Sequence, residues 1–156
     1  LLGALQDARI DVCVSFFTRL LSGGLLSAFE GRLINFHPTL LPQFPGMKGL
    51  QESFRSGAQV LGTTVHAIDA GCDTGAVLQQ TRAARSDYGT EPELRHALFN
   101  QQCRSLIQVV RWYAQGRIGW QQGRFSVTGA RYGDFDFTPA LDDAEAAACA
   151  IPYSAS

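Results

Sequence analysis

Two short apolar runs separated by one helix-length segment constrain the fold of this chain more than any other feature. The runs are residues 11–17 (DVCVSFF) and 32–36 (RLINF), and residues 25–29 lie between breaks at 22–24 and Gly31. Short runs rich in β-branched and aromatic residues are typical of buried parallel strands, although periodicity alone leaves a helix open. A strand, a short helix and a strand at this spacing predict a βαβ unit, and therefore a parallel sheet.

Further elements follow along the chain. Residues 61–68 alternate as a strand does, and residues 76–82 predict another strand. The spacing of apolar residues over 90–114 predicts one long helix. Thr90 and Glu93 match the capping-box pattern at the start of that helix.

The remaining segments define the expected domain. Proline and glycine predict an irregular loop over residues 38–49 and a tight loop over 69–75, and residues 117–128 alternate as a small hairpin does. We therefore expect one catalytic domain over residues 1–133, with an α/β fold built on a Rossmann-like, mostly parallel open sheet and flanking helices. Residues 134–156 are expected to form a loosely structured tail.

Composition argues against several classes of function. The chain has 156 residues, of which 17% are charged, and its net charge is -1, so no electrostatic feature favours nucleic acid or a membrane surface. No apolar run approaches the roughly 20 residues that span a bilayer. The four cysteines lie far apart without a C-x-x-C pair. This pattern favours reduced thiols in a cytoplasmic protein over a zinc site or a disulfide framework.

The first residues of the chain suggest an incomplete sequence. The chain begins Leu1-Leu2-Gly3 rather than with methionine. Residues 1–10 predict the end of an amphipathic helix and lack the basic segment of a signal peptide. We therefore expect the fold to be truncated at its N-terminus.

Three polar side chains stand where predicted strands pass into loops: Asn35, His37 and Asp73. Sites in open α/β sheets form at the carboxyl ends of strands. Asn35 and His37 share one face because side chains along a strand have a period of two. An amide, an imidazole and a carboxylate at one sheet edge form a candidate acyl-transfer set. Each residue type taken singly is also common in turns and in structural roles.

Two longer motifs contain these residues. Residues 34–46 read INFHPTLLPQFPG, and residues 62–75 read GTTVHAIDAGCDTG. In this order and spacing, the motifs resemble the signature segments of the folate-dependent formyltransferase superfamily, in particular the phosphoribosylglycinamide (glycinamide ribonucleotide) formyltransferases. The similarity extends from about residue 10 through residues 112–117 (WYAQGR).

The resemblance implies a reaction and a co-substrate. A formyl group would pass from 10-formyltetrahydrofolate to the amine of a small substrate, in the first instance glycinamide ribonucleotide in de novo purine biosynthesis, without a metal ion. Asn35 and a protonated His37 would stabilise the tetrahedral oxyanion. Asp73 would keep His37 protonated and help to relay the proton that the amine loses.

The resemblance also assigns binding residues. The implied folate-binding residues are Thr18, Arg19, Leu20, Leu21, Ile68, Asp69, Ala70, Gly71 and Cys72. The implied substrate-binding residues are Phe36, Pro38 and Gln102. A solvated surface role remains open for Arg19, whereas we expect His66 to be structural and His96 to be exposed.

Two departures from the family leave the acceptor amine open. The family's N-terminal strand and its Gly/Ser/Asn loop, whose backbone amides hold a phosphate, have no counterpart in this chain. On the long helix, Gln102-Cys103 stands where the family has Glu-His, which removes a charge and an imidazole. An N-formyltransferase for an amino sugar or another small amine is therefore the alternative within the same fold.

Three further classes of protein fit the motifs less well. Methionyl-tRNA formyltransferases typically have His-Gly where this chain has His37-Pro38, and they carry a basic RNA-binding domain. Formyltetrahydrofolate hydrolases usually have a second histidine in place of Pro38. An inactive folate-binding or interaction module has no need for Asn35, His37 and Asp73 together. The expected partners are thus a reduced folate and a small amine, bound to a monomer or a homodimer.

Overall fold

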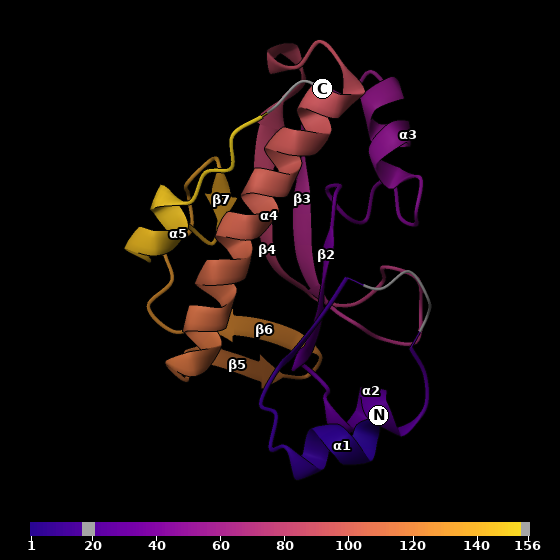
Figure 1. Ribbon diagram of the computed structural model, residues 1–156, viewed down its shortest axis with the longest axis vertical. Helices are drawn as coiled ribbons and strands as arrows, with labels where there is room; N and C mark the ends of the chain where they lie inside the picture. The colour runs from indigo at the N-terminus through magenta and orange to yellow at the C-terminus, as the bar shows by residue number, and fades with distance from the viewer. Residues whose placement is uncertain (17–20, 154–156) are drawn as a thin grey trace.

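A five-stranded sheet with the strand order β1-β2-β3-β4-β7 forms the centre of the molecule (Figure 1). The computed structural model describes residues 1–16 and 21–153. The strands of the sheet are β1 (Cys13–Ser15), β2 (Leu33–His37), β3 (Val60–Ala67), β4 (Val77–Ala84) and β7 (Phe137–Thr138). A separate hairpin consists of β5 (Ile118–Gln121) and β6 (Arg124–Val127). The helices are α1 (Leu2–Asp7), α2 (Gly24–Ala28), α3 (Gly49–Arg55), α4 (Glu91–Ala114) and α5 (Ala144–Ala148), with a 3-10 turn η1 at Arg85–Asp87.

The predicted βαβ unit is confirmed. Strand β1 pairs with β2 in parallel, with Cys13 opposite Leu33 and Ser15 opposite Asn35. Helix α2 lies between the two strands in the chain. The order of the described elements also agrees with the α/β class expected from the sequence.

The sheet contains less parallel pairing than the sequence predicted. The pairs β2–β3, β3–β4 and β4–β7 are all antiparallel. Parallel neighbours need a crossover of about a dozen residues or more, usually through a helix. Residues 68–76, which connect β3 to β4, are too few for such a crossover, so β4 returns beside β3 in the opposite direction.

Helix α4 runs along one face of the sheet and contributes to both hydrophobic clusters of the core (Figure 1). Its predicted capping box is present, because Thr90 Oγ1 accepts from the Glu93 amide and the Glu93 carboxylate accepts from the Thr90 amide. Trp112 and Val109 of α4 pack against Ile34 and other strand residues and are fully buried. Within the described residues, no helix is both long enough and apolar enough to cross a membrane.

The segment after residue 133 is ordered over its described part, which corrects the expectation of a loose tail. Phe137 pairs opposite Thr81 as β7 joins the sheet, and its side chain is buried. Ala146 of α5 is also fully buried. Figure 1 shows α5 beside α4. The small alanine side chains carry no periodic signal in the sequence, although they allow α5 to approach α4 closely.

Asp142 is the main polar anchor of this segment. Its carboxylate accepts hydrogen bonds from the Gln108 side chain at 2.7 Å, the Trp112 indole at 3.2 Å and the Arg117 guanidinium at 2.7 Å. Burial opposes ionisation of this carboxyl, but hydrogen bonds from Arg117, Trp112 and Gln108 lower its pKa below the usual value. The segment is therefore bound to α4 by a charged group as well as by packing.

Candidate active site

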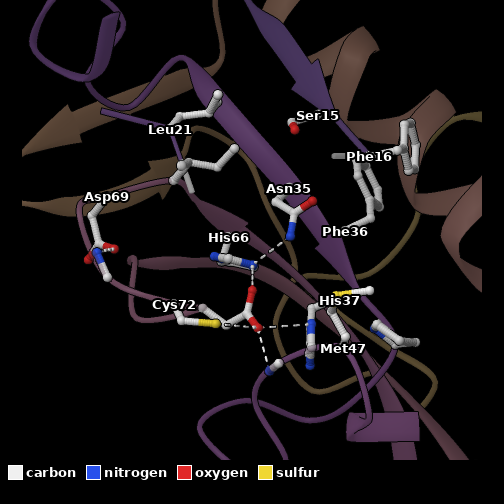
Figure 2. A pocket seen from close by; sticks show the side chains of 15 residues that line it. Ser15, Phe16, Leu21, Asn35, Phe36, His37, Met47, His66, Asp69 and Cys72 are labelled. Atoms are coloured by element: carbon white, nitrogen blue, oxygen red, sulfur yellow. Dashed lines mark hydrogen bonds and ion pairs between the residues drawn. The ribbon is translucent and has the colours of Figure 1, made fainter. Parts of the chain in front are cut away.

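The register between β2 and β3 brings the candidate catalytic side chains together. Asn35 pairs opposite His66, and His37 pairs opposite Thr64. Since side chains along a strand alternate between faces, Asn35, His37 and His66 all line the same cleft. Figure 2 shows the three side chains pointing toward one another within this cleft.

The Asp73 carboxylate links the two histidines. Its Oδ2 lies 3.4 Å from His37 Nδ1, and its Oδ1 lies 3.6 Å from His66 Nε2. Asn35 Nδ2 lies 3.3 Å from His66 Nε2. The predicted set of Asn35, His37 and Asp73 therefore converges in space, with His66 as a fourth member.

His37 is held from both sides of its ring. Nε2 lies 3.0 Å from the carbonyl oxygen of Phe44, and Nδ1 faces Asp73. Both nitrogens thus face oxygen acceptors, an arrangement that the doubly protonated ring satisfies. Phe44 has a φ of 53°, a conformation that is uncommon for a bulky residue. A Cβ on Gly49 would stand 2.2 Å from the Phe44 carbonyl oxygen, so a glycine is needed at that position.

Asp73 connects the two loops that follow β2 and β3. Its Oδ2 accepts a hydrogen bond from the backbone amide of Gly46 at 2.7 Å. Its own φ of 55° lies in the left-handed region, where aspartate is tolerated better than most residues. This side chain is only 13% exposed, so solvent screens its interaction with His37 weakly. The contact with Gly46 fixes the carboxylate between the loops before any ligand binds.

His66 was expected to be structural, and the structure instead places it in the cleft. Burial, the dominant influence, lowers the pKa of its imidazole, although the Ala67 carbonyl and Asp73 oppose this effect. The short distance to Asp73 suggests an ion pair, whereas burial favours the neutral ring. We assign the neutral form because Nδ1 can donate to Ala67 O at 2.8 Å while Nε2 accepts from the Asn35 amide. In this form His66 orients Asn35.

The sequence did carry a signal for His66. Residues 61–68 alternate, which places Thr64 and His66 on one face of the strand. What the sequence alone did not supply was the antiparallel register that sets His66 opposite Asn35.

The cleft has a volume of about 310 Å³ and contains most of the predicted folate-binding residues that the structure describes. Its lining includes five of those residues: Leu21, Ile68, Asp69, Gly71 and Cys72. Ala70 is exposed and does not line it. Thr18, Arg19 and Leu20 lie outside the described residues. The exposed Cys72 thiol has a raised pKa, caused first by desolvation and then by Asp73, so it is held in the neutral form.

A second cleft of about 760 Å³ adjoins the first through Phe36 and Pro38, which line both. Gln102 of α4 lines only this second cleft. The three predicted substrate-binding residues therefore meet in one place. His96 also lines it and is half-buried, with Nε2 at 2.7 Å from the Ile151 carbonyl oxygen, so the expectation of a solvent-exposed His96 is wrong.

Within residues 1–16 and 21–153, no group of three or more His, Cys, Asp or Glu side chains is placed to hold a metal ion. The polar groups gathered around Asp73 in the first cleft include the Asn35 amide and the His37 and His66 imidazoles. Together they can donate hydrogen bonds to an oxyanion and accept a proton.

Comparison with known families agrees with this geometry. The family model described as Formyl transferase matches residues 1–110, most of the chain. The chain therefore belongs to the formyl transferase family. The fold class and the resemblance expected from the sequence are thereby confirmed.

Two curated relatives show which formyl transferases the chain resembles. The phosphoribosylglycinamide formyltransferase of Bacillus subtilis (strain 168) is 39% identical over 79 residues, which cover 51% of this chain and 40% of that protein. The enzyme of the same name from Mycobacterium tuberculosis (strain H37Rv) is 41% identical over 101 residues, covering 64% of this chain and 47% of the relative. The chain thus spans less than half the length of these curated relatives.

A solved structure supports the fold. Glycinamide ribonucleotide transformylase 1 from Symbiobacterium toebii superposes with a TM-score of 0.72 at 32% identity, covering 80% of this chain and 59% of that one. The similarity confirms the formyltransferase fold for this chain.

Proposed function

We propose that this chain carries the transfer centre of a phosphoribosylglycinamide formyltransferase. The reaction moves a formyl group from 10-formyltetrahydrofolate to the amine of glycinamide ribonucleotide. The observation that supports this most strongly is the convergence of Asn35, His37 and Asp73 in one cleft of a chain that belongs to the formyl transferase family. The activity for which the two relatives are named supports the choice of acceptor.

In this proposal the reduced folate occupies the first cleft. The side chains of Leu21 and Ile68 supply apolar contact for its ring system, and Asp69 supplies a hydrogen-bond acceptor. The loop of residues 68–73 then forms one wall, with the formyl group placed beside Asn35 and His37.

The amine attacks the formyl carbon and forms a tetrahedral intermediate with a negative oxygen. Asn35 Nδ2 uses one hydrogen for His66 and can donate the other to this oxygen. The positive charge on His37 stabilises the oxygen in a site that is largely shielded from water. Removing one such donor typically costs about 10²–10³ in rate.

The intermediate collapses as the bond from carbon to the folate nitrogen breaks. The proton that the amine loses passes to the Asp73 carboxylate, directly or through water, and leaves on the folate nitrogen. The new amide and the deformylated folate are the products, so atoms and charges balance. Asp73 is suited to this role because the Gly46 amide and His37 hold its position.

The acceptor enters from the second cleft in this scheme. Phe36 and Pro38 line both clefts, so an amine held in the second cleft lies beside the proposed position of the formyl carbon. Gln102 offers the acceptor a neutral amide, where the family has a carboxylate. This loss of a negative charge favours one further candidate for the acceptor, an amino sugar or another small amine.

The test is a formyl-transfer assay with the full-length gene product that carries this chain. Glycinamide ribonucleotide and a panel of amino sugars are offered separately with 10-formyltetrahydrofolate, and the formylated products are identified by mass spectrometry. We expect the ribonucleotide to be formylated and the His37→Gln variant to be inactive but folded. Formylation of amino sugars alone would show that the acceptor is an amino sugar rather than the ribonucleotide. The absence of any formylated amine would refute the proposed function.

A further inference from the structure

The far wall of the second cleft comes from the C-terminal end of the described chain. The lining residues of this cleft are Phe36, Pro38, Leu50, Pro92, Arg95, His96, Leu98, Phe99, Gln102 and Tyr153. All but Tyr153 belong to the segment from β2 to α4. We name residues 149–153 the strap. Figure 1 shows the described segment after α5 running back along α4 toward the helix's first turns.

Hydrogen bonds hold the strap on α4. Asn100 Oδ1 accepts from the Ile151 amide at 2.6 Å, and Asn100 Nδ2 donates to the Ile151 carbonyl at 3.0 Å. His96 Nε2 lies 2.7 Å from the same carbonyl. Both backbone groups of Ile151 are therefore hydrogen-bonded to side chains of one helix, which fixes the strap at this residue.

The helix that leads into the strap, α5, is fixed as well. Arg104 Nε donates to the carbonyl of Ala146 at 3.3 Å, and its terminal nitrogen donates to the carbonyl of Ala147. These carbonyls lie at the end of α5, where they have no partner within the helix. Asp142 anchors the segment before α5. The strap thus continues a chain segment that is fixed from Asp142 onward.

These anchors place one aromatic ring at the cleft. The Tyr153 ring lies 5.0 Å from the His96 ring, centroid to centroid, and it lines the second cleft. Tyr153 and Phe99 are each 49% exposed. Two half-exposed aromatic side chains in one cleft retain apolar surface that a ligand can bury.

We propose that the strap is a specificity element of the acceptor side, in which Tyr153 packs against the sugar ring of the acceptor. The inference rests on the proposed function. It goes further because it assigns substrate recognition to a segment outside the family match, which ends at residue 110. Asn100 is then a positioning residue, since it holds the strap but does not line the cleft.

The observations favour a sugar-bearing amine as the occupant. The cleft adjoins the catalytic cleft at Phe36 and Pro38, so a ligand bound there lies next to the proposed formyl site. The C–H face of a sugar ring suits the aromatic surfaces of Phe99 and Tyr153, and its hydroxyl groups suit the Gln102 amide. In the proposed function the folate occupies the first cleft, which is lined by the predicted folate-binding residues Leu21 and Ile68.

Steady-state kinetics of the full-length gene product test this inference. The acceptor is glycinamide ribonucleotide or, if the assay above replaces it, the amine that is formylated. In Tyr153→Ala and Asn100→Ala, we expect the KM for the acceptor to rise about tenfold, an effect of the size that one aromatic contact produces. The kcat and the KM for 10-formyltetrahydrofolate should stay within about twofold.

Matched variants exclude a general loss of structure. Tyr132→Ala removes another exposed tyrosine, which lines neither cleft, and should leave the acceptor KM unchanged. Tyr153→Phe keeps the ring and should retain an acceptor KM near that of the unmodified protein. Thermal unfolding confirms that each variant is folded before its kinetics are compared.

The outcomes separate the two proposals. If the unmodified protein formylates an amine while Tyr153→Ala and Asn100→Ala keep its acceptor KM, the strap has no role in recognition and only this inference fails. An equal rise in both KM values would likewise contradict it. If the unmodified protein formylates no amine, the proposed function fails and this inference fails with it.

Discussion

The two clefts share the Phe36–Pro38 wall but differ in how they are built. The first cleft is lined by polar groups that already contact one another, with His37 and His66 almost fully buried. The second cleft is lined by half-exposed aromatic side chains from α4 and the strap. The proposed chemical step therefore uses groups positioned in advance. Acceptor recognition instead depends on half-exposed aromatic surfaces that become buried only when a ligand binds.

The greatest loss of activity is expected for Asn35→Ala. Comparison of this variant with Asn100→Ala separates catalysis from recognition. Asn35→Ala removes the amide that is proposed to donate to the formyl oxygen, so kcat should fall by about 10²–10³. Asn100→Ala on α4 should leave kcat nearly unchanged. Rapid-quench measurement of single turnovers reports the chemical step directly. Similar kcat values for Asn35→Ala and the unmodified protein would erase the distinction between the clefts.

A second prediction tests whether catalysis in the first cleft depends on the position of the loop that carries Asp73. A Cβ on Gly75 would lie 1.8 Å from the Ala67 backbone oxygen, so Gly75→Ala must displace the loop that carries Asp73. A displacement of about 1 Å can cost about 10² in rate. Gly3→Ala, where a Cβ meets nothing within 4 Å, is the control. Full activity in Gly75→Ala, measured by the same transfer assay, would show that the position of Asp73 is not critical.

The third prediction concerns the segment that carries the strap. Asp142→Ala leaves the buried Trp112 indole and the Gln108 amide without their acceptor, and the expected loss in the free energy of unfolding is about 1–3 kcal/mol. Asp87→Ala, on the exposed η1 turn, should change it by less than about 0.5 kcal/mol. Urea titration measures both changes. Equal stabilities for the two variants would show that Asp142 does not anchor the segment.

The pH dependence of the Asp142 contribution has a definite sign. The folded-state pKa of this carboxyl is lowered, so its contribution to stability is present above the unfolded value of about 3.9 and is lost as pH falls through the folded value. The difference in the free energy of unfolding between Asp142→Ala and the unmodified protein should therefore disappear in acid. A difference that persists unchanged well below pH 3 would contradict this linkage.

The weakest effect is expected for His66 and tests its protonation state in the first cleft. Its folded-state pKa is lowered, mainly by burial, so the stability associated with the neutral ring is present above the unfolded value of about 6.5 and is lost as pH falls through the folded value. His66→Gln should remove this part of the slope between about pH 7 and about pH 5, as followed by urea unfolding at each pH. An identical slope in the variant would show that folding does not lower the pKa of His66.

Much of the local structure around the first cleft could be predicted from the sequence alone. Residues 32–36 predicted a strand before an irregular loop, and β2 ends at His37, one residue beyond that prediction. The glycine-rich segment 69–75 predicted the tight loop that carries Asp73. Both predictions depend on local chemistry, since period-two alternation and the φ preferences of proline and glycine act between neighbouring residues. The catalytic roles of these residues stay predictions.

Several features escaped the sequence because they depend on distant partners. The antiparallel register that sets His66 opposite Asn35 depends on how β3 docks against β2. The order in the segment after residue 133 depends on Asp142, whose partners on α4 are 30 or more residues away in the chain. Alternation and composition contain no information about such pairings, which arise only when whole elements pack together.

Local chemistry was enough to specify most of the helices and strands, their order and the three polar residues at the ends of strands, because each of these depends on side chains and backbone preferences a few residues apart. The packed fold was needed to establish that His66 orients Asn35, that most strand pairs run antiparallel and that Tyr153 lines the second cleft. The physical reason is that register and long-range hydrogen bonds are properties of packed elements, and Asn100 and Ile151 meet across 51 residues of chain.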